Sequence, residues 1–97
     1  MQHIAMEGRV WVLSCNQYVV KENLPDWLES DAKEDEVICR GGSLICNPFG
    51  GIVAGPLFAE GLLYAQIDLD ACVRGKMDLD VCGHYSREDL FKLTVRE

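Results

Sequence analysis

Apolar residues fall into short runs along this chain, and their spacing alternates between helical and extended periods. Near the start, Met1, Ile4 and Ala5 recur at helical spacing and Gly8 follows them, so the pattern predicts the last turns of a helix. The run at 10–15 is then almost continuously apolar, which is typical of a strand covered on both faces. We therefore expect a short helix that leads into a central strand.

Polar and acidic side chains dominate residues 17–36. Pro25 and the acidic stretch from Glu29 to Glu36 predict a surface loop. A loop of this length suits a lid or a contact segment, such as a subunit contact or a rim over a substrate entrance. The simpler interpretation is a solvated loop.

Two apolar runs at 37–39 and 44–46 follow the loop, and each predicts a strand. The Asn, Pro and Gly residues at 47–51 are a strong turn signal. Residues 52–54 would then form the return strand of a hairpin, and we expect Gly55-Pro56 to end it.

The last third of the chain predicts four further elements. Residues 62–69 alternate as a strand, and apolar positions from 69 to 77 then recur at helical spacing, with Asp68 or Asp70 as the cap. Residues 86–89 resemble a capping box before a short helix, and 93–95 alternate as a final strand.

The predicted order gives one α/β (α+β) domain, residues 1–97, without repeats or a linker. A chain of 97 residues can form one small domain at most. The strands are too few for a sheet covered on both sides, so we expect part of a larger sandwich.

Charge and hydropathy exclude several classes of function. The net charge is −7, which opposes binding to nucleic acid or to an anionic membrane. No apolar run approaches the roughly 20 residues that cross a bilayer, and the N-terminus lacks the pattern of a secretory signal. We therefore expect a cytoplasmic protein.

The chain has five cysteines, an odd number, and no pair has C-x-x-C spacing. We interpret them as reduced, mostly buried thiols, with a disulfide framework, a zinc site or a small redox module as alternatives. Cys15 and Cys46 fall in predicted strands and Cys72 faces inward on a predicted helix, which makes a thiol inert. Cys39 precedes Arg40 and is the most reactive candidate, but no base lies nearby in sequence, so a packing role is favoured.

Three other polar patterns have a functional and a structural interpretation. Asp78, Asp80, Cys82 and His84 alternate and could present metal ligands on one side of a strand. His84 otherwise packs in a turn, and His3 is interpreted as a helix-face residue. The glycine-rich segment 41–43 lacks the lysine and the helix of a phosphate-binding loop.

Several phrases together resemble the C-terminal portion of nitrilases, the carbon–nitrogen hydrolase family, and cover essentially the whole chain in the family's order. The fungal and plant types look most similar. The phrases run from His3 to Arg9, from Val12 to Tyr18, from Cys39 to Ser43, from Asn47 to Gly50, from Ala54 to Leu57, from Asp68 to Asp70, from Lys76 to Asp80, and from Gly83 to Arg87, with Asp89, Leu90 and Phe91 after it.

The resemblance implies an αββα sandwich that forms dimers or longer spirals. It also implies hydrolysis of a nitrile to a carboxylic acid and ammonia. A cysteine thiolate attacks the nitrile carbon, a glutamate acts as base, and a lysine stabilises the charged intermediate, as such chemistry requires. The resemblance implies no cofactor and a metal-free segment at 78–84.

The catalytic motif of the family, Cys-Trp-Glu, is absent from this chain. Trp11 follows Val10 and Trp27 follows Asp26, and the family's glutamate and lysine lie further upstream. We therefore assign no catalytic and no metal-binding residue, and the substrate-binding residues are unknown. Met1 falls where family members are in mid-helix, and Glu88 replaces a usual proline.

The sequence thus predicts a nitrilase fragment whose parent enzyme hydrolyses nitriles and which lacks activity alone. We expect a homo-oligomer or association with a full-length nitrilase. The alternatives are a non-catalytic remnant or assembly partner, and a small cysteine-rich metal or redox module.

Overall fold

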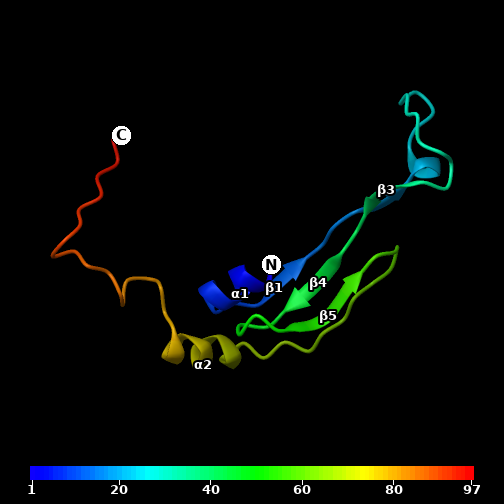
Figure 1. Ribbon diagram of the computed structural model, residues 1–97. Coiled ribbons are helices and arrows are strands. Elements are labelled where there is room, and N and C mark those ends of the chain that lie inside the picture. The colour runs from blue at the N-terminus through cyan, green and yellow to red at the C-terminus, as the bar shows by residue number, and fades with distance from the viewer.

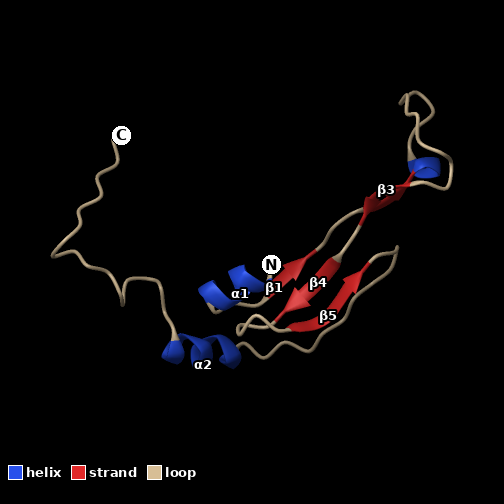
Figure 2. Ribbon diagram, viewed as in Figure 1, coloured by secondary structure: helices blue, strands red, loops and turns tan.

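Two small antiparallel sheets and two helices form the regular part of the structure (Figures 1 and 2). A computed structural model describes residues 1–97. Neither helix is long and apolar enough to cross a membrane. The elements are α1 Gln2–Gly8, β1 Val12–Ser14, β2 Tyr18–Val20, a 3₁₀ turn Lys21–Asn23, β3 Val37–Arg40, β4 Ser43–Cys46, β5 Ile52–Leu57 and α2 Asp70–Asp78.

The main sheet has the strand order β1-β4-β5. Leu13 of β1 lies opposite Ile45 of β4, which in turn lies opposite Ala54 of β5. The predicted helix end and strand are confirmed, but the expectation of a central strand at 10–15 is wrong for this chain. β1 is an edge strand, because the chain supplies β4 on one side and no strand on the other.

β2 and β3 form a two-stranded arm that projects from the main sheet (Figure 1). The prediction of a loop over 17–36 is therefore only partly correct. Residues 18–20 pair with β3, because Val19 lies opposite Cys39 and the apolar pair stabilises a ladder. The backbone amide of Lys21 donates to the carbonyl of Glu36 over 2.9 Å, and the acidic residues beyond this closure form an exposed tip.

The predicted turn at 47–51 is confirmed, and so is the hairpin that β4 and β5 form on its two sides. The Asn47 side-chain oxygen accepts hydrogen bonds from the amides of Phe49 and Gly51, each over 3.0 Å. The return strand continues through Gly55-Pro56 to Leu57, so the prediction that these residues end it is wrong. Gly55 adopts φ +86 at an irregularity of the ladder, which lets the strand continue past the proline.

The predicted strand at 62–69 is wrong. These residues are extended but have no ladder partner. They run back past β5 towards the start of β1 (Figure 1). A Leu63 methyl group lies against Gly55, and the Trp11 indole donates to the Asp68 carbonyl over 2.9 Å.

The predicted helix near 69–77 is confirmed as α2, but the predicted cap by Asp68 or Asp70 is wrong, because Leu69 is the N-cap and no side chain caps the helix. Asp68 instead forms a turn just before it. One carboxylate oxygen of Asp68 accepts a hydrogen bond from the Asp70 backbone amide over 3.0 Å. The other accepts a hydrogen bond from the Arg74 guanidinium over 2.6 Å. Arg74 and then the amide lower the pKa of Asp68. The face of α2 that is buried differs from the predicted face, on which Cys72 pointed inward. Ala71 and Gly75 face inward, because they allow close approach to Arg9, whereas Met77 is 85% exposed.

Residues 79–97 leave α2 as an extended tail (Figure 1). The Arg87 carbonyl accepts the amides of Leu90 and Phe91, each over 2.9 Å, so the predicted short helix is a single turn. The predicted strand at 93–95 is absent, since no other strand lies alongside, and Leu93 is 91% exposed.

The Arg9 side chain joins three distant segments. It follows α1 in a left-handed conformation with φ +49 and is only 8% exposed. Its guanidinium donates to Asp78 over 2.9 Å and lies 5.3 Å from the centre of the Phe49 ring. Its aliphatic stem lies against Gly75. Arg9 therefore connects α1, the 47–51 turn and α2.

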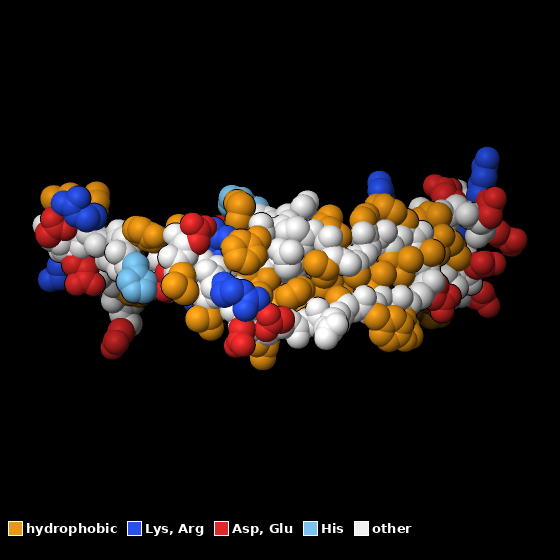
Figure 3. Space-filling model, turned by 90° about the horizontal axis from the view of Figure 1, so that it is seen from below, with side chains coloured by type: hydrophobic (Ala, Val, Ile, Leu, Met, Phe, Trp, Pro, Cys, Tyr) orange, Lys and Arg blue, Asp and Glu red, His pale blue; other side chains and the backbone are white.

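Most of the apolar surface stays open. Only seven of the 97 residues are buried, and the accessible surface is 7997 Å², against about 5,600 Å² for a compact protein of this mass. The radius of gyration is 19.7 Å, against about 13 Å for a compact domain. Apolar side chains spread over the face in Figure 3, and acidic ones gather at the arm tip. The fold is mixed α and β, and the αββα layering remains a prediction.

Replacement of Arg9 by Met should lower the free energy of unfolding by about 1–2 kcal/mol, because it removes the ion pair and the ring contact but keeps an unbranched stem. The matched control Asp78→Asn should cost less than about 1 kcal/mol, because the Asp78 side chain is 73% exposed. Urea denaturation monitored by tryptophan fluorescence measures both. Equal losses of unfolding free energy in the two variants would contradict the role of Arg9 in joining α1, the 47–51 turn and α2.

Replacement of Gly55 by Ala should destabilise the sheet by about 2–4 kcal/mol, because the new Cβ would lie 2.5 Å from the Ser43 carbonyl oxygen at a φ of +86. Gly83→Ala is the matched control, because Gly83 has φ +98 but an added Cβ would meet no atom within 4 Å, and it should cost only about 1–2 kcal/mol. Thermal unfolding followed by circular dichroism compares them. A larger loss of stability in the Gly83 variant would contradict this expectation, because it would mean that the structure shifts to relieve the contact between the new Cβ at position 55 and the Ser43 carbonyl oxygen.

Candidate functional site

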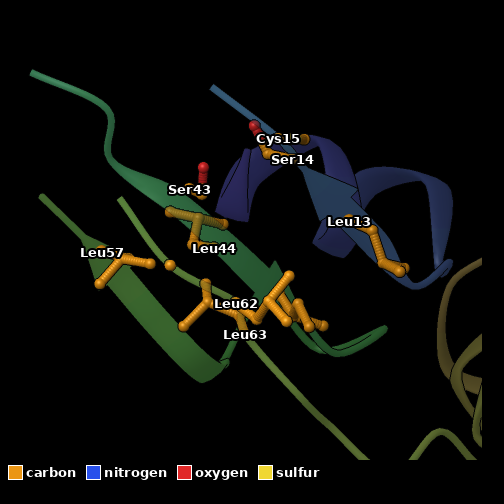
Figure 4. Close-up of a pocket in the computed structure, with 10 residues that line it drawn as sticks. Leu13, Ser14, Cys15, Ser43, Leu44, Leu57, Leu62 and Leu63 are labelled. Carbon is orange, nitrogen blue, oxygen red and sulfur yellow. The ribbon is translucent and has the colours of Figure 1, made fainter. Parts of the chain in front are cut away.

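An apolar hollow lies between β1, β4 and the segment after β5 (Figure 4). Its volume is about 230 Å³, and seven of its ten lining residues are hydrophobic. Ser14 and Ser43 provide its polar side chains. The lining residues are Leu13, Ser14, Cys15, Ser43, Leu44, Ile45, Leu57, Gly61, Leu62 and Leu63.

The hydroxyl group of Ser43 is fully used by the backbone. It accepts the Asn16 amide over 2.9 Å and donates to the Asn16 carbonyl over 3.1 Å. A serine nucleophile needs a base that takes its proton, and this proton points to a carbonyl instead. Ser43 therefore connects Asn16, the second residue after β1, to the start of β4.

The five cysteines are free thiols with different exposure. Cys46 is buried as predicted, but Cys15 is exposed because β1 ends before it, and Cys72 is half-buried. Cys39 is half-buried, and its sulfur accepts a hydrogen bond from the side-chain amide of Gln17 over 3.2 Å. A neutral amide cannot take the thiol's proton, so this contact does not activate Cys39.

The alternating set Asp78, Asp80, Cys82 and His84 does not converge. Asp78 ends α2 and pairs with Arg9, while Asp80 accepts the Cys82 amide over 3.0 Å and contacts the His84 ring over 2.9 Å. The Cys82 amide, and then His84, lower the pKa of Asp80. The structure shows no group of three potential metal ligands, here or elsewhere.

The glycine-rich segment 41–43 connects the arm to the main sheet. The Gly42 amide donates to the Leu57 carbonyl over 2.8 Å, so it is not free to bind an anion. The Arg40 guanidinium lies 4.4 Å from the centre of the Phe58 ring. His3, at the other end of the chain, lies 3.4 Å from Glu7 on the exposed face of α1.

No sequence pattern pointed to Arg9 and Phe49, whose contact helps to join α1, the 47–51 turn and α2. The only local signal was the glycine that ends α1 just before Arg9. Their contact depends on a turn that lies about forty residues further along the chain.

Comparison with known proteins assigns the family. The sequence model described as carbon-nitrogen hydrolase matches residues 1–76. An arylacetonitrilase of Trametes versicolor is 46% identical over 100% of this chain and 32% of its own length. A nitrilase of Bradyrhizobium diazoefficiens is 49% identical over 98% of this chain and 30% of its own length.

A bifunctional nitrilase/nitrile hydratase of Nicotiana tabacum is 40% identical over 100% of this chain and 30% of its own length. The chain thus spans about a third of the length of these relatives. The matching family model and the shared identity confirm the resemblance: this chain belongs to the carbon–nitrogen hydrolase family.

Proposed function

We propose that this chain is the C-terminal part of a nitrilase domain whose whole protein hydrolyses a nitrile to a carboxylic acid and ammonia. The observation that carries the proposal is the match to named nitrilases along the entire chain. The family's Cys-Trp-Glu phrase is absent here, so the nucleophile, the glutamate base and the lysine belong to the preceding part of the domain. A cytoplasmic location fits the five free thiols.

The chain's contribution would be scaffold and pocket wall. β1, β4 and β5 supply a sheet, and the leucines of the hollow supply an apolar surface that would exclude water once the domain is complete. Such a surface strengthens the electrostatic interactions that stabilise a charged intermediate. The relatives include enzymes named both nitrilase and nitrile hydratase, and the proposal is for the nitrilase reaction.

The acidic tip of the arm is the proposed subunit contact or entrance rim. Residues 21–36 contain seven acidic and two basic side chains, so they carry −5 of the net charge of −7. Trp27 is 81% exposed among them. Exposed tryptophans are frequent anchors of protein interfaces.

A second candidate function is that of an assembly partner for a full-length nitrilase. The exposed surface favours it, since the chain exposes about 2,400 Å² more than a compact protein of its mass. The partner would cover the apolar side chains that this chain leaves open.

The purified chain should release no ammonia from phenylacetonitrile or from an aliphatic nitrile, because the hydrogen-bond partner of Cys39, the most reactive candidate, is a neutral amide and not a base. Ammonia should stay at the level of a buffer blank over hours. The variant Cys39→Ala is the matched control for the most reactive candidate. Release by the wild-type chain, and its loss in that variant, would contradict the proposal.

A chimera tests the proposed function directly. The 102 matched residues of the Trametes versicolor arylacetonitrilase are replaced in place by this chain. We expect a kcat/KM on an arylacetonitrile within about tenfold of the relative's, which is about 1.4 kcal/mol in the barrier. The relative without those residues is the inactive control. A soluble chimera without activity would overturn the proposal.

A further inference from the structure

The base of the arm lies against the segment that follows β5. Arg40 is the last residue of β3, and its guanidinium lies 4.4 Å from the centre of the Phe58 ring. The Gly42 backbone amide donates a hydrogen bond to the Leu57 carbonyl over 2.8 Å. The contact therefore has two parts, a cation against a ring and a hydrogen bond between two backbones.

The connection between β3 and β4 consists of two glycines. Gly41 and Gly42 both have left-handed backbones, with φ +78 and φ +88. A glycine backbone enters left-handed and right-handed regions about equally well, so this connection is a flexible joint. The Phe58 ring lies against it, because a Cβ added at Gly42 would be 3.3 Å from a ring carbon. The ring and Arg40 therefore restrain the arm at the point where its backbone is most flexible.

Arg40 is directed to the ring and not to a carboxylate. Residues 21–36 of the arm contain seven acidic side chains, but none of the ion pairs of the chain includes Arg40. Phe58 is 49% exposed. An exposed contact between a cation and a ring adds little to the free energy of unfolding. Its effect should therefore appear in the position of the two segments that it joins.

One of these two segments forms a wall of the apolar hollow. Leu57, Leu62 and Leu63 line the hollow on this side (Figure 4). Residues 58–63 belong to no helix or strand, so no ladder of hydrogen bonds fixes their position. The contact of Phe58 with the arm therefore holds the start of this segment in place.

We propose that Arg40 and Phe58 are positioning residues for the substrate pocket of the nitrilase domain. They lie outside the hollow, and they set the positions of Leu57, Leu62 and Leu63 within it. An apolar wall contacts the organic group of a nitrile, so nitriles with a bulky apolar group depend on it most. This inference rests on the proposed function and adds two residues that control the shape of the pocket.

The test uses the chimera with the Trametes versicolor arylacetonitrilase. Arg40→Met keeps the unbranched stem and removes the cation, and Phe58→Leu removes the ring. Each should raise the KM for phenylacetonitrile at least about threefold and keep kcat within about twofold, because contacts that bind the ground state are lost while the reacting groups are unchanged. The KM for propionitrile should change by less than about twofold, because a small nitrile touches less of the wall.

Conservative variants and matched controls separate positioning from a general loss of structure. Arg40→Lys keeps a cation and Phe58→Tyr keeps a ring, so each should hold the KM for phenylacetonitrile within about twofold of the wild-type chimera. Arg96→Met and Phe91→Leu make the same changes at exposed positions of the tail. These two controls should leave the KM for both nitriles unchanged.

Hydrogen exchange in the free chain provides a second measurement that needs no catalysis. The Gly42 amide should exchange with deuterium at least about threefold faster in Arg40→Met and in Phe58→Leu, because the joint opens more often when the ring contact is lost. The two tail controls should leave this rate unchanged. Nuclear magnetic resonance measures the exchange, and circular dichroism shows whether each variant folds as the wild type does.

The outcomes separate the inference from the proposed function. An active chimera whose Arg40→Met and Phe58→Leu variants keep the KM for phenylacetonitrile overturns the inference and leaves the proposed function standing. Equal losses on both nitriles, or a loss in kcat alone, also overturn the inference. A soluble wild-type chimera without activity overturns the proposed function and the inference with it. If a variant chimera is insoluble, the Gly42 exchange rate decides, and an unchanged rate overturns the inference.

Discussion

The Arg9 guanidinium contacts Asp78 and Phe49, and it is the buried link between α1, the 47–51 turn and α2. Exposed hydrogen bonds from Gln2 to Gly50 and from Lys76 to Gly8 lie beside it. α1 and β1 lie next to each other in the sequence, but the 47–51 turn and α2 are distant from both. Because few residues are buried, the usual apolar core does not perform this task. The Arg9 guanidinium, a cation with several N–H donors, makes the buried connection instead, because it contacts both the Phe49 ring and the Asp78 carboxylate.

The open apolar surface supports the proposed function. A short chain with seven buried residues and a continuous apolar strand at its edge has the features of one part of a larger domain. The relatives, of which it spans about a third, give that domain a family. Under the proposed function, the hollow beside β1 would be a surface that other residues of the domain complete, and the reaction would belong to the completed domain.

The sequence predicted the elements that depend on local signals. The glycine at the end of α1 and the Asn47 turn each act within a few residues, and both were recognised. The predicted cap of α2 by Asp68 or Asp70 was wrong, because Leu69 is the N-cap and Asp68 forms a turn just before it. The edge position of β1, the unpaired segment at 62–69 and the inward face of α2 depend on distant neighbours. Periodicity cannot report whether a neighbouring strand exists. The site followed the same rule, since family phrases identified the chain but no local pattern predicted the hollow.

The closure at the base of the arm has a consequence for variation within the family. The hydrogen bond from Lys21 to Glu36 fixes the two ends of the tip against each other. The geometry of the main sheet therefore does not depend on the length of the segment between these two residues, and a longer connection costs only a small additional entropy. Insertions, deletions and fused peptides should be tolerated there. Related proteins can thus acquire different outer surfaces on an unchanged scaffold.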